Sequence, residues 1–80
     1  MSNDPWTKVE RTYGAYIDAV CKEQLANISH MAARHADPDG ELCKTKRAAW
    51  ENARSLKATT YVEHVQSVDE AVQSGIPCPW

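Results

Sequence analysis

The sequence predicts an all-α protein, an antiparallel helical hairpin with a short third helix and an extended Pro-rich C-terminal tail. Two long segments carry apolar residues at helical spacing, and they flank the densest group of helix breakers, Ala36-Asp37-Pro38-Asp39-Gly40. A chain of 80 residues forms one domain at most. We therefore expect a single helical domain over 1–80, divided into a helix at 5–35, a turn at 36–40, a helix at 41–65, a short helix at 68–74 and a tail at 75–80.

The first helix has a clear start. Asp4 can cap free backbone N–H groups, and Pro5 suits the first helical position. Gly14 costs about 1 kcal/mol relative to Ala but does not have to break a helix, so one long helix is expected. Its apolar residues recur at helical spacing: Trp6, Val9, Tyr13, Ile17, Val20, Leu25, Ile28 and Met31.

The second helix is predicted to start in the same way, because Asp37 precedes Pro38 as Asp4 precedes Pro5. Residues 59–65 are rich in β-branched side chains and could form a strand, but a lone strand has no partner, which favours helix. The apolar stripe of this helix consists of Leu42, Ala49, Trp50, Ala53, Leu56, Thr60, Tyr61 and Val65.

The end of the chain predicts a third helix and a tail. Ser67 and Glu70 match a capping box, which indicates either a new short helix or a sharp bend. Gly75 is a typical helix stop. The two prolines of the tail require extended backbone up to Trp80. The tail can pack either on its own chain or on another one, and the sequence favours neither strongly.

A hairpin turning at 36–40 also predicts which residues face each other. Leu56 should lie opposite Val20, and Trp50 opposite Leu25 and Ala26. Tyr61 should lie opposite Gly14, which would give this glycine a packing role. Cys21 and Cys43 would be about 16 Å apart along the axis, too far for a disulfide.

The composition predicts a thin core. Large aliphatic residues are few, there is no Phe, and alanine fills many apolar positions. Such a domain often completes its core with another chain, so we expect a homo-oligomer or a protein partner. The net charge of −2 gives no general attraction to nucleic acid or to an anionic membrane. The three cysteines and the lack of a signal-like segment favour the cytoplasm.

The sequence gives little support for catalysis, a cofactor or a metal site. No two cysteines have zinc-ligand spacing, there is no H-E-x-x-H motif, and we expect no metal site. No Gly-rich phosphate loop and no G-x-S-x-G motif occur either. A two-helix protein also lacks a roomy pocket that excludes water, so we expect neither an enzyme nor a cofactor.

One helix face concentrates positive charge. Lys44, Arg47 and Arg54 share this face with a single acid, Glu51. The face could meet an acidic partner or a phosphate, or it could be a solvated face with Arg47–Glu51 and Glu51–Arg54 pairs. Nucleic acid is disfavoured because the basic footprint is small.

The aromatic residues are all Trp or Tyr, which are enriched at interfaces. Tyr13, Trp50 and Tyr61 are expected in the core, whereas Tyr16 and Trp6 are better interface candidates. The predicted partner-binding residues are Tyr16, Arg47, Glu51, Arg54 and Trp80. A possible anion-binding set consists of Lys44, Arg47, Arg54, Lys57 and Tyr13.

Three functions are compatible with these features. The leading one is a small cytoplasmic interaction protein, an inhibitor or adaptor of the kind that phages and mobile elements carry, which occupies a surface of another macromolecule. The second is an oligomer of hairpins that binds a small anionic ligand such as a nucleotide. The third is a structural subunit of a larger assembly.

Overall fold

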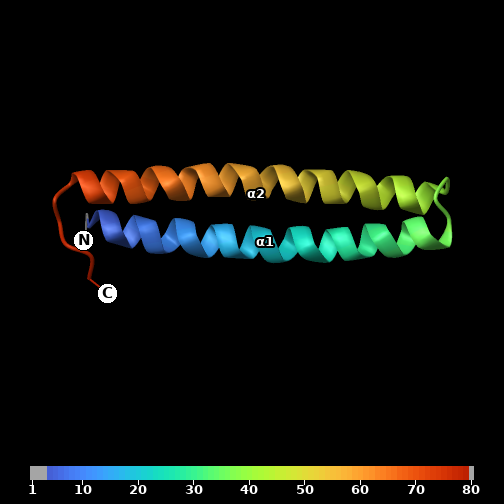
Figure 1. Ribbon diagram of the computed structural model, residues 1–80, viewed down its shortest axis with the longest axis horizontal. Helices are drawn as coiled ribbons and strands as arrows, with labels where there is room; N and C mark the ends of the chain where they lie inside the picture. Colours follow the sequence, from blue (N-terminus) through green and yellow to red (C-terminus); the bar gives the residue numbers. More distant parts are fainter. Residues whose placement is uncertain (1–3, 80) are drawn as a thin grey trace.

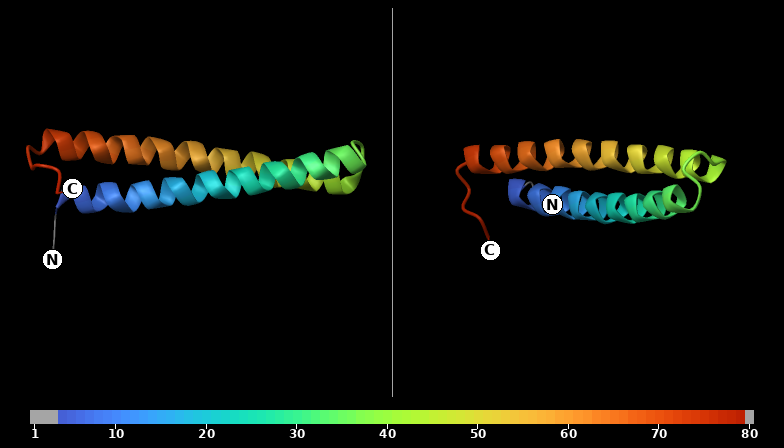
Figure 2. Two further views of the ribbon diagram at one scale, coloured as in Figure 1. Left: turned by 60° about the horizontal axis from the view of Figure 1, so that its bottom comes forward. Right: turned by 45° about the vertical axis from the view of Figure 1, so that its right-hand side comes forward.

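The chain folds into a helical hairpin in the computed structural model, which describes residues 4–79. Helix α1 (Pro5–Ala36) and helix α2 (Glu41–Gln73) lie side by side, and residues 37–40 join them (Figure 1). The result is a rod, seen from two further directions in Figure 2. Its extents are 54 × 19 × 17 Å. The all-α class is confirmed, and residues 59–65 are helical.

Helix α1 begins as its sequence predicts. Asp4 is the N-cap, and its carboxylate accepts a hydrogen bond of 2.9 Å from the Trp6 N–H. Lys22 and Asp18 form an ion pair of 2.9 Å one turn apart. The helix ends where the Asp37 N–H donates to the Ala33 carbonyl at 2.9 Å.

Helix α2 does not repeat the start of α1. Its N-cap is Gly40, which offers no side-chain cap, and Asp37 is instead the C-cap of α1. The Gly40 N–H donates to the Asp37 carbonyl at 3.2 Å, so residues 37–40 form a tight turn and not the first turn of a helix. A Cβ on Gly40 would lie 2.5 Å from Asp37 Oδ2, so a larger residue here would require the Asp37 carboxylate to move.

The predicted third helix is not separate. Helix α2 continues through residues 65–68 to Gln73, and Ser67 lies buried inside it rather than capping a new helix. Its hydroxyl donates to the His64 carbonyl at 2.7 Å. A capping box requires free N–H groups, and the unbroken helix leaves none here. Gly75 then adopts a left-handed φ of 76° and ends the helical run, as predicted.

Residues 76–79 have no regular secondary structure. The Trp6 indole N–H donates to the Ile76 carbonyl at 2.7 Å. This bond holds the start of the tail beside the first turn of α1.

The two helices meet along residues that repeat every three and four positions, the spacing of a coiled coil. We call these residues the seam. Most are small or polar, and the largest side chains among those that are fully buried are Cys43 and Ser67. The seam consists of Val9, Thr12, Tyr16, Ala19, Glu23, Ala26, His30 and Ala33 of α1, and of Cys43, Lys46, Trp50, Ala53, Lys57, Thr60, His64, Ser67 and Ala71 of α2.

Most large apolar residues lie outside the seam, which contradicts their predicted place in the core. Their exposed fractions run from 41% at Ile17 to 68% at Leu25. Helical periodicity identifies the apolar side of a helix but not the neighbour that covers it. The exposed set from the two predicted stripes consists of Tyr13, Ile17, Leu25, Ile28, Met31, Leu42, Leu56, Tyr61 and Val65.

The predicted packing role of Gly14 is wrong. A Cβ at this position would have no heavy atom within 4 Å beyond its own helix backbone and chain neighbours, because the Tyr61 ring lies against Tyr16 instead. The expectation for the cysteines is confirmed, since Cys21 is an exposed thiol and Cys43 a buried one. Within residues 4–79, neither helix contains a stretch that could cross a membrane.

Candidate interaction surfaces

A hydroxyl pair, of which Ser67 is buried and Thr12 half-buried, joins the helices in the half of the rod nearer the termini. Thr12 Oγ1 lies 2.6 Å from Ser67 Oγ and 3.1 Å from His64 Nδ1. A serine beside a histidine is a possible nucleophile and base, but Ser67 is only 1% exposed. A substrate cannot reach its hydroxyl, so this cluster pairs the helices and fixes their register.

Aromatic rings continue this part of the seam. Tyr16 lies 5.5 Å from Tyr61, measured between ring centroids, and its ring stacks with that of His64 at 6.4 Å. Tyr13 contacts His64 at 5.5 Å. Tyr16, a predicted partner-binding residue, is therefore half-buried between the helices, whereas Tyr13 and Tyr61 are more than half exposed.

Trp50 organises the seam in the half nearer the turn. Its indole N–H donates to Glu23 Oε1 at 3.1 Å, and its ring stacks on His30 with centroids 5.6 Å apart. The Arg54 guanidinium lies 5.6 Å from the same ring, a cation–π distance. Lys57 completes the cluster with an ion pair of 3.7 Å to Glu23.

His30 has an unusual environment in this cluster. The residue is 6% exposed, and its Nε2 is buried with no hydrogen-bond partner in the described part of the chain. Because the Trp50 ring is stacked on the His30 ring, it offers no hydrogen-bond acceptor to the His30 nitrogens. The ring stacking is therefore the main contact of His30.

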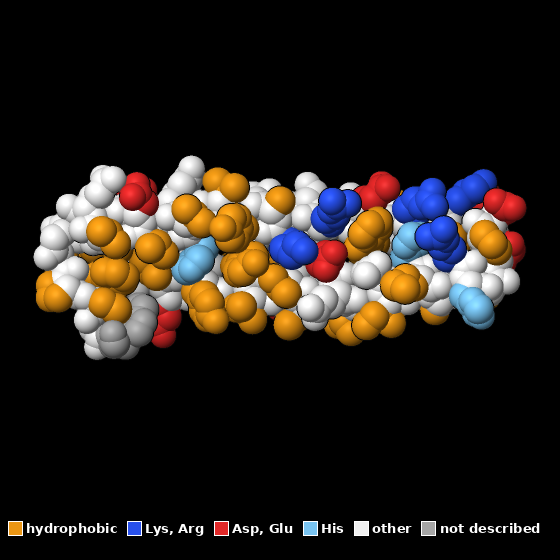
Figure 3. Space-filling view, viewed as in Figure 1, with side chains coloured by type: hydrophobic (Ala, Val, Ile, Leu, Met, Phe, Trp, Pro, Cys, Tyr) orange, Lys and Arg blue, Asp and Glu red, His pale blue; other side chains and the backbone are white. Residues whose placement is uncertain are grey.

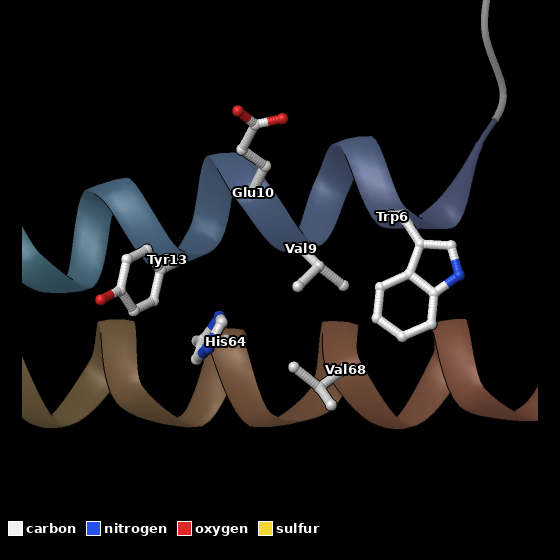
Figure 4. Close-up of a pocket in the computed structure, with 6 residues that line it drawn as sticks. All are labelled: Trp6, Val9, Glu10, Tyr13, His64 and Val68. Carbon is white, nitrogen blue, oxygen red and sulfur yellow. The ribbon is translucent and has the colours of Figure 1, made fainter. Parts of the chain in front are cut away.

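A groove of about 530 Å³ opens between the helices near the termini (Figure 4). Val9 and Val68 point toward one another across it, and Trp6 and Tyr13 flank it along α1. The Glu10 carboxylate points away from α2, so the lining is largely apolar, and the His64 imidazole adds a polar group from α2.

An apolar stripe extends from this groove along the outside of the hairpin. Its members are exposed or half-buried, and they follow the groove residues at helical spacing. In Figure 3 the hydrophobic side chains gather over the half nearer the termini and along α1. The apolar stripe consists of Tyr13, Ile17, Val20, Ile28 and Met31 of α1, and of Tyr61, Val65, Val68 and Val72 of α2.

The basic strip, defined as Lys44, Arg47 and Arg54, lies on α2 toward the turn, where Figure 3 shows Lys and Arg side chains. Lys44 has a weak exposed pair with Glu41 at 3.8 Å. The ion pairs among residues 4–79 do not include the alternative pairs of Glu51 with Arg47 or Arg54. The two guanidinium groups are therefore not neutralised by a described carboxylate.

The predicted anion-binding set does not come together in one hairpin. Tyr13 packs against His64, and His64 lies about 25 Å from Arg47 along the α2 axis. Lys57 is already paired with Glu23. Trp80, the remaining predicted partner-binding residue, lies outside the described residues.

Residues 4–79 contain no group of three or more His, Cys, Asp or Glu side chains that could hold a metal ion. The sequence did not lead us to predict that Thr12, Glu23 and Ser67 contact the opposite helix across the seam. The signal that could have found them is the three-four spacing of small and polar residues, which runs parallel to the more conspicuous apolar stripe.

Comparison of the chain with protein-family models, with curated proteins and with solved structures finds no match.

Proposed function

We propose that this chain is a cytoplasmic protein–protein interaction module, an inhibitor or adaptor that acts by occupying a surface of another macromolecule. Its form is an antiparallel hairpin with an extended tail. The observation that carries the proposal is the exposed basic strip, in which Arg47 and Arg54 have no carboxylate partner among the described residues.

An acidic protein surface fits this strip best. Arg is enriched at binding hot spots because its planar guanidinium pairs with carboxylates in two places at once. Trp50 holds Arg54 by its ring, so part of the ordering cost of binding is already met in the free protein. Glu51, between the two arginines, gives the strip a pattern that a uniformly acidic polymer would not match.

The alternative of a nucleotide-like ligand has weaker support. Its proposed residues are spread along the rod, so a single hairpin cannot surround a small anion with them. Such a ligand would need residues from two chains.

A charge-reversal experiment tests the proposal. A partner is first isolated with the tagged chain from its native host, and its affinity is then measured by calorimetry. Arg47→Glu with Arg54→Glu should weaken binding by about 2 kcal/mol or more. Arg11→Glu with Lys22→Glu changes the net charge equally on α1 and should leave the affinity nearly unchanged. Equal effects of the two double variants would contradict the proposal.

A further inference from the structure

The hairpin exposes more surface than a folded chain of its mass normally does. Its accessible surface is 5944 Å², whereas a compact monomer of 8.9 kDa is expected to expose about 4,800 Å². The surplus of about 1,100 Å² exceeds the roughly 800 Å² that each partner buries in a standard interface. One further chain could therefore cover the surplus.

Seven of the twelve large apolar side chains that are exposed among the described residues belong to the apolar stripe. The apolar stripe includes Ile17 and Tyr61, both more than 40% exposed, and it borders the groove floored by Val9 and Val68. Contiguous apolar surface of this kind marks an interaction site on a small protein. The seam beneath it buries only small or polar groups in its fully buried positions, so the hairpin alone has little core.

We propose that a second copy of this chain covers the apolar stripe, and that two hairpins form a two-fold symmetric four-helix bundle. A two-fold dimer requires one self-complementary surface, and a stripe running along α1 supplies it. Packing the two stripes together forms the large apolar core that each hairpin lacks. The seam then serves as the contact within a hairpin and the stripe as the contact between hairpins.

Charge selects the orientation of the two copies. The basic strip occupies only the half of each hairpin nearer the turn. Copies with their turns at the same end would bring the two basic strips to one level, where like charges repel. Copies with their turns at opposite ends separate the strips toward the two ends of the rod.

Sedimentation velocity of the full chain tests this inference. Between about 5 and about 200 µM, we expect a species of twice the 8.9 kDa chain mass, and a melting temperature that rises with concentration. Ile17→Glu should raise the dimer dissociation constant by about 100-fold, because two-fold symmetry places two charges in the apolar interface. Leu56→Glu, at a position of similar exposure outside the stripe, should leave this constant nearly unchanged.

Three results would overturn the inference. They are a wild-type monomer whose melting temperature is independent of concentration, a trimer or larger ring, or equal effects of the two Glu variants. The melting series uses the wild-type chain, so it remains decisive even if Ile17→Glu unfolds. The dimer and the proposed function can also fail separately, since Arg47→Glu with Arg54→Glu should weaken partner binding and leave the dimer intact.

The orientation has its own test. With Cys21 and Cys78 changed to Ser, a spin label at Asp39→Cys reports the distance between the two turns. We expect a separation close to the 54 Å length of the rod. A separation of less than half the 54 Å length of the rod would place the turns at the same end of the bundle and contradict the charge argument.

Discussion

Gly14 lies within α1 at an exposed position where a Cβ would have no heavy atom within 4 Å beyond its own helix backbone and chain neighbours. Gly14→Ala should therefore stabilise the protein by about 1 kcal/mol through helix propensity alone. This corresponds to a rise in melting temperature of about 4–8 °C, measured by circular dichroism. If the glycine accommodated a ring of α2, as the sequence suggested, the same change would lower the melting temperature.

Gly75 provides the matched control for this change. Its φ of 76° lies in the left-handed region, which costs a residue with a Cβ about 1 kcal/mol or more. Gly75→Ala should accordingly lower the melting temperature while Gly14→Ala raises it. Shifts in the same direction would contradict the assigned conformations.

Thr12 and Ser67 allow a test of the seam at the level of single atoms. Their hydroxyl oxygens lie 2.6 Å apart between the helices. Either change to Ala should cost about 1 kcal/mol in the free energy of unfolding, because it leaves a buried hydroxyl with one partner fewer. Chemical denaturation of both single variants and of the double variant should give a coupling energy of at least about 0.5 kcal/mol. Additive losses of stability in the double variant would show that the two hydroxyls do not interact.

Local chemistry made some of these residues predictable and others not. Asp4, Gly75 and the Asp18–Lys22 pair act on their own helix, so their neighbours are known from the sequence alone. Thr12 and Ser67 depend on a contact across the hairpin. No property of either residue indicates that contact until the register is known.

At the scale of the elements, α2 is the main departure from expectation. Ser67 and Glu70 have the right types for a capping box, but Ser67 faces Thr12 in the seam and the helix continues. Sequence spacing cannot distinguish a serine that caps a helix from one that packs inside it. The turn shows the same ambiguity, because Asp37 closes α1 instead of starting α2.

Proline substitution distinguishes the two forms of α2. Position 68 would be the first residue of a helix capped by Ser67, where proline is tolerated. In a continuous helix, Val68→Pro should cost about 3 kcal/mol or more, measured by chemical denaturation. Val68→Ala removes the same packing without breaking the helix and serves as the control. Nearly equal losses for the two variants would restore the predicted third helix.

At the scale of the whole molecule, the sequence predicted the hairpin but not the sides by which its helices meet. The turn at 36–40 and the helical spacing of the large apolar residues led us to expect that Leu56 and Val20 face each other. The structure instead joins the helices through small and polar residues and leaves Leu56 47% exposed. The thin core predicted a further chain, but the sequence did not indicate which side of the hairpin that chain would cover.

Disulfide trapping tests most directly which sides of the two helices face each other. Thr12→Cys with Ser67→Cys should form a bond within one chain, since the two hydroxyl oxygens that the sulfurs replace are 2.6 Å apart. Val20→Cys with Leu56→Cys should not, and peptide mapping by mass spectrometry identifies each bond. Trapping of Val20 with Leu56, without trapping of Thr12 with Ser67, would show that the large apolar residues and not the seam lie between the helices, which would contradict the structure described above.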